Sequence, residues 1–207
     1  MIFRRFAGIF AILSCLATAS QARPTVTTHQ VNGYDVFLIN IHNGNAIGLS
    51  GIDAKLLVAK RYAEQDLGFV GEITQVNTSF IRSMLNDGCL PVIAPLGVDD
   101  EGTVYNINAD IAAAEIAKAL GATKLIYLTD VEGIQVGKVL VKCLTQSDAE
   151  NFIRQKIING GMIPKVESAL DALKVGVKKV HIIDGRKPHA LLLEIFTTEG
   201  VGTEIVS

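Results

Sequence analysis

The sequence predicts an α/β fold in which helices cover both faces of a mostly parallel β-sheet. From about Val36 onward, short β-branched runs alternate with amphipathic runs, and glycines close many of them. Such alternation is typical of layered α/β/α sandwiches. The chain has 207 residues, 49% of them hydrophobic, which suffices for a substantial core in one large domain or two small ones.

Three strands and a helix are expected first. The strand runs combine β-branched residues with glycine punctuation, and they are residues 45–51, 56–62 and 69–76. Residues 77–88 predict a helix that ends at Gly88. The run LPVIAPLGV, residues 90–98, predicts one buried strand, and the turn DDEG then leads to a further strand at residues 103–107.

The middle of the chain predicts a helix over residues 108–120 and a buried strand, KLIYLTDV, over residues 124–131. Residues 132–138 are polar and rich in glycine, so we expect a loop there. Ser147 and Glu150 have the spacing of a capping box, which predicts the start of the next helix.

The last part of the chain predicts a helix from near Pro164, because apolar residues recur at i, i+3, i+4 and i+7 from Val166. Residues 179–184 predict a buried strand and residues 188–196 a helix. Residues 202–206 predict a terminal strand at the edge of the sheet.

The first 22 residues have the pattern of an export signal. Arg4 and Arg5 precede an apolar run, and the small residues Ser20 and Ala22 occupy the −3 and −1 positions of a cleavage site. The run is too short, and too soon followed by polar residues, for a transmembrane span. An organelle transit segment, against which the few hydroxyl and basic residues argue, and a stretch fused upstream of a domain whose beginning is missing are the alternatives.

The composition favours small molecules as partners. The net charge is −2 and acidic and basic residues are interspersed, which argues against nucleic acid as a partner. The three cysteines have no CxxC spacing and the four histidines are scattered, so the sequence predicts neither a zinc site nor a disulfide framework. A metal, if one is needed, is expected to arrive with a ligand.

The stretch IINGGMIPK predicts an anion site. Gly160 and Gly161 precede a helix N-terminus, where unpaired N–H groups and a partial positive charge attract anions, and Lys165 adds a mobile cation. A phosphate would suit this site. The alternative is an ordinary glycine turn before a helix, with Lys165 in solvent.

Two further loops follow predicted strands, at the carboxyl ends where α/β folds place their sites. Asn106, Asn108 and Asp110 stand at a helix entrance, where they either cap the helix or hold a carboxylated substrate and orient a lysine.

In the second of these loops, Thr129 and Asp130 end a strand and Gly133 bends the chain. They either form a simple strand-to-loop transition, cap a helix, or hold the ribose and adenine of a nucleotide.

These segments resemble the C-terminal part of the amino acid kinase family, and within it the acetylglutamate kinases. The resemblance runs from about Asn40 to Ser207, so that residues 1–22 form a leader, residues 23–39 do not match, and residues 40–207 form a partial kinase-like domain. The segments that carry it are GLSG, DLGFVGEITQVN, PVIAPLGV, YNINAD, LTDVEGI, GGMIPKVESALDAL and VHIIDGRKPHALLLEIFTTEGVGTEIV.

The resemblance implies the amino acid kinase fold and phosphoryl transfer from ATP to the γ-carboxylate of N-acetyl-L-glutamate, a step of arginine biosynthesis. It implies that Lys165 stabilises the transition state, that Asp110 orients the catalytic lysines and that Asn106 binds the substrate. Magnesium would be carried by ATP, with no metal held by the protein itself. The nucleotide-binding residues would be Thr129, Asp130, Gly133, Gly160, Gly161 and Met162.

The C-terminal segment resembles that of arginine-inhibited members of the family. This implies that His181, Glu194 and Gly200 help to hold L-arginine, whose guanidinium a carboxylate such as Glu194 can bind with two hydrogen bonds. The alternative is that Glu194 is an exposed residue on a helix flank. The resemblance further implies a homo-oligomer.

The family's amino-terminal part normally contains a lysine, two glycine loops and a substrate-binding arginine, and no segment of this sequence matches them. The sequence therefore predicts an N-terminally truncated kinase fold, completed by a separate piece or with impaired catalysis. In the second case the chain is a nucleotide- or arginine-binding module. A kinase acting on aspartate or on unacetylated glutamate is a further alternative.

Substrate supply favours the cytoplasm, or the plastid in a plant or alga, whereas the leader favours export. No membrane contact is expected once the leader is removed.

Overall fold

The computed structural model describes residues 9–12, 44–64, 67–197 and 200–207. Most of the expected leader and all of residues 23–39 lie outside the described residues. The chain divides into two compact units: unit 1 ends at Ile116, and unit 2 runs from Ala117 to Ser207 and also takes in strand β1 (Ile9–Ile12). Helix α3 (Ala109–Leu120) crosses the division.

Unit 1 contains two small sheets. In the first, β2 (Ala46–Ser50) and β5 (Leu90–Ala94) pair in parallel, and α2 (Thr78–Asn86) packs against β5. The second has the order β4–β3–β6–β7. Its strands are β3 (Leu57–Arg61), β4 (Gly71–Val76), β6 (Leu96–Val98) and β7 (Val104–Asn106). A short 3-10 helix, η2 (Asp53–Lys55), joins β2 to β3.

The single strand expected over residues 90–98 is wrong. The run is divided at Pro95 into β5 and β6, which belong to different sheets. Proline has no N–H group to donate to a ladder of hydrogen bonds, and Pro95 stands directly after the last residue of β5. Its carbonyl oxygen accepts a bond from Ile107 N at 3.0 Å instead, so the chain turns there toward the second sheet.

Unit 2 is built on a five-stranded sheet of order β1–β8–β12–β13–β11. The strands beyond β1 are β8 (Lys124–Thr129), β11 (Cys143–Thr145), β12 (Lys179–Asp184) and β13 (Thr203–Val206). All neighbours pair in parallel except β12 and β13. The expected position of the terminal strand at an edge is wrong, because β11 pairs along the outer side of β13.

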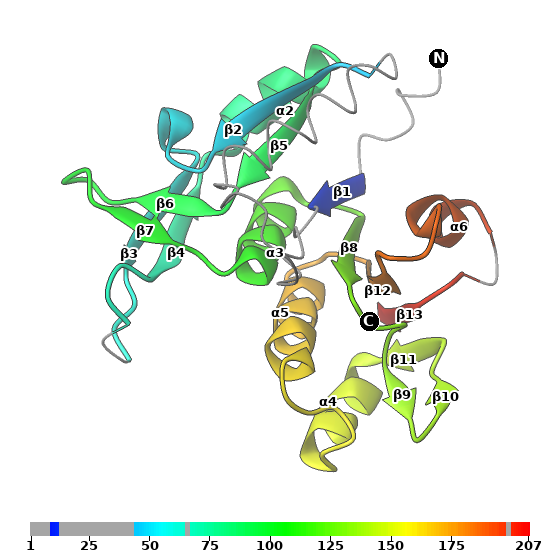
Figure 1. Cartoon of the computed structure of the whole chain (residues 1–207). Helices are drawn as coiled ribbons and strands as arrows, with labels where there is room; N and C mark the ends of the chain where they lie inside the picture. The colour runs from blue at the N-terminus through cyan, green and yellow to red at the C-terminus, as the bar shows by residue number, and fades with distance from the viewer. Residues whose placement is uncertain (1–8, 13–43, 65–66, 198–199) are drawn as a thin grey trace, which may run out of the picture. The chain divides into compact units, whose positions relative to one another are not determined.

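Helices cover both faces of this sheet (Figure 1). Helices α4 (Gln146–Arg154) and α5 (Met162–Lys174) lie on one face, and α6 (Ala190–Phe196) lies on the other. Side chains alternate between the faces of a strand, so Ile126 and Ile183 pack under α6 with Ala190. The neighbouring positions, Tyr127 among them, face α5. The α/β class expected from the sequence is confirmed.

Two local predictions in unit 2 need correction. Helix α4 begins two residues early, because Thr145 rather than Ser147 caps it: the Thr145 side chain accepts from Asp148 N and the Asp148 carboxylate accepts from Thr145 N. The expected loop at residues 132–138 contains the short strand β9 (Gln135–Val136), which forms a hairpin with β10 (Val139–Leu140) directly after the loop.

Candidate functional site

The first turn of α5 places Lys165 inside unit 2. The helix begins at Met162, two residues before the expected start, so Pro164 lies in the first turn, where a missing N–H costs little. The Lys165 residue is only 8% exposed, and its ammonium lies 5.0 Å from the centroid of the Tyr127 ring. The alternative of a solvated Lys165 is therefore wrong.

Two N–H groups of this first turn already have hydrogen-bond partners, whereas the sequence predicts unpaired ones. Met162 N donates to the Asn159 carbonyl at 3.3 Å, Ile163 N donates to the Gly160 carbonyl at 3.2 Å, and Pro164 has no N–H to offer. An anion at this end of α5 would therefore depend mainly on the helix dipole and on the Lys165 ammonium.

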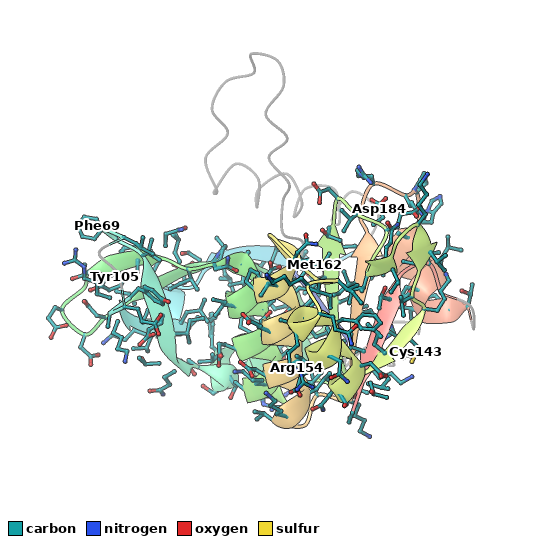
Figure 2. All side chains as sticks on the ribbon, turned by 90° about the horizontal axis from the view of Figure 1, so that it is seen from below. Phe69, Tyr105, Cys143, Arg154, Met162 and Asp184 are labelled. Atoms are coloured by element: carbon teal, nitrogen blue, oxygen red, sulfur yellow. The ribbon has the colours of Figure 1, made fainter. Side chains whose placement is uncertain are left out.

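The two glycines before α5 differ in what they require. Gly160 has a φ of +56°, in the left-handed region that favours glycine. Gly161 has a φ of −66°, which any residue adopts. A Cβ atom added at either position would meet no atom of the described part of the chain within 4 Å, so these glycines border open space. Met162, at the start of α5, and Asp184, at the end of β12, are labelled in Figure 2.

The loops after β8 and β12 are tied to each other. Gly185 N donates to the Thr129 carbonyl at 2.8 Å, and Lys187 Nζ lies 2.8 Å from a Glu132 carboxylate oxygen. The Thr129 hydroxyl donates to Asp130 at 3.3 Å, while the Asp130 residue is exposed. The strand-to-loop transition thus brings two of the expected nucleotide-binding residues to the carboxyl edge of the sheet.

Gly133 approaches a buried threonine from β13. Its φ is +138°, and an added Cβ would lie 2.6 Å from the Thr203 hydroxyl oxygen. That hydroxyl accepts from Ile134 N at 2.9 Å and donates to the Val141 carbonyl at 2.7 Å. Packing alone therefore accounts for glycine at this position. Thr203 was not a candidate in the sequence, because its partners lie more than 60 residues away.

A buried carboxylate at the end of β12 was also missed. Asp184 accepts two hydrogen bonds of 2.9 Å from the Arg186 guanidinium and one of 3.0 Å from Arg186 N. The guanidinium bond is the largest influence and outweighs burial, so the pKa of Asp184 lies below its ordinary value. The only sequence signal was the DGRK run directly after a buried strand.

His181, Glu194 and Gly200, the three residues expected to hold arginine, lie together. The Glu194 carboxylate is 2.7 Å from His181 Nδ1 and accepts from Val201 N at 2.6 Å and from Gly202 N at 3.2 Å. A Cβ added at Gly200 would lie 2.8 Å from Glu194 Oε2.

This glutamate is 8% exposed, which contradicts the alternative of an exposed helix flank. Burial opposes its ionisation, yet the hydrogen bonds from His181 and the two N–H groups prevail, and the pKa of Glu194 lies below its usual range. His181 Nε2 is buried without a hydrogen-bond partner in the described part of the chain, 3.7 Å from Glu204.

The remaining candidates belong to unit 1. Asn108 caps α3, since its side-chain oxygen accepts from Asp110 N at 2.9 Å and from Ile111 N at 3.3 Å. Asp110 lies in the first turn of α3, and Asn106 ends β7 with an exposed side chain. Capping is thus confirmed for Asn108, and the meeting of Asp110 or Asn106 with Lys165 stays a prediction.

The described residues contain neither a metal-binding cluster nor a membrane-spanning helix. Within them, no three His, Cys, Asp or Glu side chains are grouped so that they could hold a metal ion. Among the same residues, no helix has both the length and the apolar character needed to cross a membrane.

Comparison with known protein families shows to which family the chain belongs. A model described as the amino acid kinase family matches residues 34–184, which is more than half of the chain. The chain belongs to the amino acid kinase family.

The most similar relatives of this amino acid kinase chain include two acetylglutamate kinases. The enzyme of Pelodictyon phaeoclathratiforme is 52% identical over 179 residues, which are 86% of this chain and 59% of that protein. The enzyme of Chlorobaculum tepidum is 53% identical over 179 residues, 86% of this chain and 63% of that protein. The resemblance expected from the sequence is confirmed, and the chain spans about three fifths of the length of these relatives.

Solved structures agree with this family fold. A protein of Streptococcus mutans UA159 is 28% identical with a TM-score of 0.74, over 86% of this chain and 68% of that one. The N-acetylglutamate synthase of Neisseria gonorrhoeae, complexed with coenzyme A and L-arginine, is 25% identical with a TM-score of 0.71. It matches 94% of this chain and 41% of its own.

Proposed function

We propose that this chain carries the C-terminal part of an acetylglutamate kinase site and takes part in phosphoryl transfer from ATP to the γ-carboxylate of N-acetyl-L-glutamate. The observation that carries the proposal is the identity of 52% and 53% with two acetylglutamate kinases over 86% of the chain.

In such a transfer the protein positions the reactants and neutralises the charge on the moving phosphoryl group. Lys165 suits this role, because its ammonium is held in a buried first turn of a helix and can meet developing negative charge without reorganising. Asp110 would orient the ammonium, and the Asn106 amide would hold the carboxylated substrate.

The nucleotide would lie at the open approach before α5. The bare surfaces of Gly160 and Gly161 would let the phosphates come close to the backbone, with Met162 beside them. Thr129, Asp130 and Gly133 would contact the nucleoside at the carboxyl edge of the sheet. Magnesium would enter with ATP as part of the substrate, and its positive charge would offset the negative charge of the phosphates.

The test is ADP release by the full chain with Mg-ATP and N-acetyl-L-glutamate. We expect Lys165→Ala to reduce the rate by roughly 10²–10³, as loss of one charge-stabilising group does. The matched control is Lys174→Ala, which removes an exposed lysine at the other end of α5. Aspartate and unacetylated glutamate are tested in the same assay as alternative phosphoryl acceptors. The same assay is repeated with the amino-terminal third of a relative added.

Activity that survives Lys165→Ala would contradict the proposed role of this lysine. No turnover by the chain, alone or with the added fragment, would contradict the proposed reaction.

A second function is favoured by the buried cluster of His181, Glu194 and Gly200. If catalysis is impaired, the chain would act as a nucleotide- or arginine-binding module, and this cluster would hold the guanidinium of L-arginine through Glu194. Calorimetric titration with L-arginine tests this function. The heat of binding should disappear in Glu194→Gln, and L-citrulline, which lacks the guanidinium charge, should not bind.

We place the protein in the cytoplasm, or in the plastid of a plant or alga, because its proposed substrates are intracellular. The apolar N-terminal run supports export instead. Mass spectrometry of the mature amino terminus separates the two, since loss of residues 1–22 would contradict the cytoplasmic placement. The proposed homo-oligomer is tested by light scattering on the same sample.

A further inference from the structure

Tyr127 is a polar residue in the centre of a buried apolar strand. It lies in β8 within the run KLIYLT and is 2% exposed. A leucine would fill the same part of the core, as Leu125 does two residues earlier on the same face of β8. A buried phenol instead needs a hydrogen-bond partner, so the reason for a tyrosine lies in what its ring and its hydroxyl contact.

Both parts of the side chain contact the first turns of α5. The ring lies under the Lys165 ammonium, 5.0 Å from centroid to Nζ, within the distance at which a cation is attracted to a ring face. The hydroxyl oxygen is 2.9 Å from Ser168 Oγ, and Ser168 Oγ donates to the Lys165 carbonyl oxygen at 3.0 Å.

The order of the protons follows from these distances. Ser168 has one hydroxyl proton, and it is used toward the Lys165 carbonyl oxygen. Ser168 Oγ must then accept from Tyr127, so the chain of donors runs from the Tyr127 hydroxyl to Ser168 and on to the Lys165 backbone. Tyr127 is thus linked to Lys165 at two points. Its ring contacts the ammonium, and its hydroxyl is connected through Ser168 to the Lys165 backbone.

We propose that Tyr127 is a positioning residue that aims the Lys165 ammonium at the phosphoryl group. A lysine side chain has much rotamer freedom, and a ring face that attracts the ammonium narrows its directions while replacing part of its lost hydration. The hydroxyl bond to Ser168 fixes the helix turn from which the side chain extends. This inference rests on the proposed kinase function for its kinetic consequence, but not for its geometry.

The geometry is tested without turnover by nuclear magnetic resonance of the full chain with ¹³C-labelled lysine. Protons over a ring face resonate upfield, so the ε-methylene protons of Lys165, assigned by their absence in Lys165→Ala, should be shifted upfield. The shift should persist in Tyr127→Phe, which keeps the ring, and disappear in Tyr127→Leu. The control Leu125→Val shortens a side chain on the same face and should leave the shift unchanged.

Kinetics separate positioning from mere stability. We expect Tyr127→Leu to lower kcat about tenfold, which corresponds to about 1.4 kcal/mol of transition-state stabilisation, with KM for N-acetyl-L-glutamate within about twofold. Tyr127→Phe should restore most of kcat, and Leu125→Val should lower the unfolding midpoint without lowering kcat.

An unshifted Lys165 resonance in the wild-type chain, or an equal loss of shift in the phenylalanine and leucine variants, would overturn the inference. A chain without turnover would contradict the proposed function, while the spectra still decide whether Tyr127 places the ammonium.

Discussion

Thr203→Val is the substitution whose cost the structure defines most closely. Thr203 is fully buried, and its hydroxyl bridges two backbone groups of another segment: it accepts from Ile134 N and donates to the Val141 carbonyl. Valine has nearly the same shape but no hydroxyl, so both backbone groups lose their partner while the packing is kept.

The expected loss follows from those two bonds. A buried donor or acceptor left without a partner costs about 1–3 kcal/mol. Ile134 is 3% exposed, so its N–H is largely shielded from water, whereas Val141 is half-buried and water can partly replace its lost bond. We therefore expect Thr203→Val to lower the free energy of unfolding by about 2–4 kcal/mol. Thr203→Ser keeps the hydroxyl and loses one methyl group, at about 1 kcal/mol.

Urea denaturation followed by circular dichroism measures the free energy, and amide hydrogen exchange at Ile134 measures the local bond. Protection of this amide should be lost in Thr203→Val and kept in Thr203→Ser. The matched control is Thr74→Val, whose hydroxyl makes one exposed bond to the Val58 carbonyl at 3.3 Å and should matter little. A Thr203→Val protein within about 0.5 kcal/mol of wild type would refute the reasoning, as would a serine variant that is destabilised equally.

Three further predictions concern other parts of the two units. The pKa of Asp184 is lowered in the folded chain, so its bond to Arg186 stabilises the fold above the unfolded pKa of about 3.9. This stabilisation is lost as pH falls through the lower folded pKa. The Tm difference between wild type and Asp184→Asn should therefore be largest near neutral pH and should shrink below about pH 4. Gly200→Ala should cost about 1–3 kcal/mol in urea denaturation, because its φ is +58° and the new Cβ would press on Glu194; a neutral result would contradict the contact. Gly51→Ala would place a Cβ 1.9 Å from a backbone oxygen of β6 and should leave unit 1 unfolded by circular dichroism, whereas a folded variant would contradict this close approach.

The sequence located the elements whose signal is local. Strands β2, β3, β4, β8 and β12 fall within their predicted runs, because each has its own apolar pattern. Strand β11 was not predicted, because three residues are too few to show a periodicity. Its first residue, Cys143, pairs with Glu204, which lies far along the chain. Pro95 is visible in the sequence, but the division of the predicted strand into β5 and β6 depends on which sheet each half joins, and the sequence does not show that.

The candidate site was predicted by resemblance more than by pattern. The glycine turn and Lys165 were identified as an anion site from residue types alone, yet the burial of the lysine was not, because a lysine after a glycine turn is usually solvated. Tyr127 and Thr203 were missed for one physical reason. Each looks like ordinary strand filling in sequence, and its polar function becomes visible only when a helix or a distant loop supplies the partner atoms.

Glu194 shows how a structural role and a regulatory role can compete for the same oxygen atoms. Its Oε2 atom accepts from two N–H groups of the segment at Val201 and Gly202, and its Oε1 atom lies against His181. A guanidinium that bound this carboxylate with two hydrogen bonds would displace at least part of that set. If L-arginine binds at this cluster, binding must therefore rearrange the segment after α6, and protection of the Val201 and Gly202 amides from hydrogen exchange should fall when arginine is added. Unchanged protection together with measurable binding would place the arginine site elsewhere in the chain.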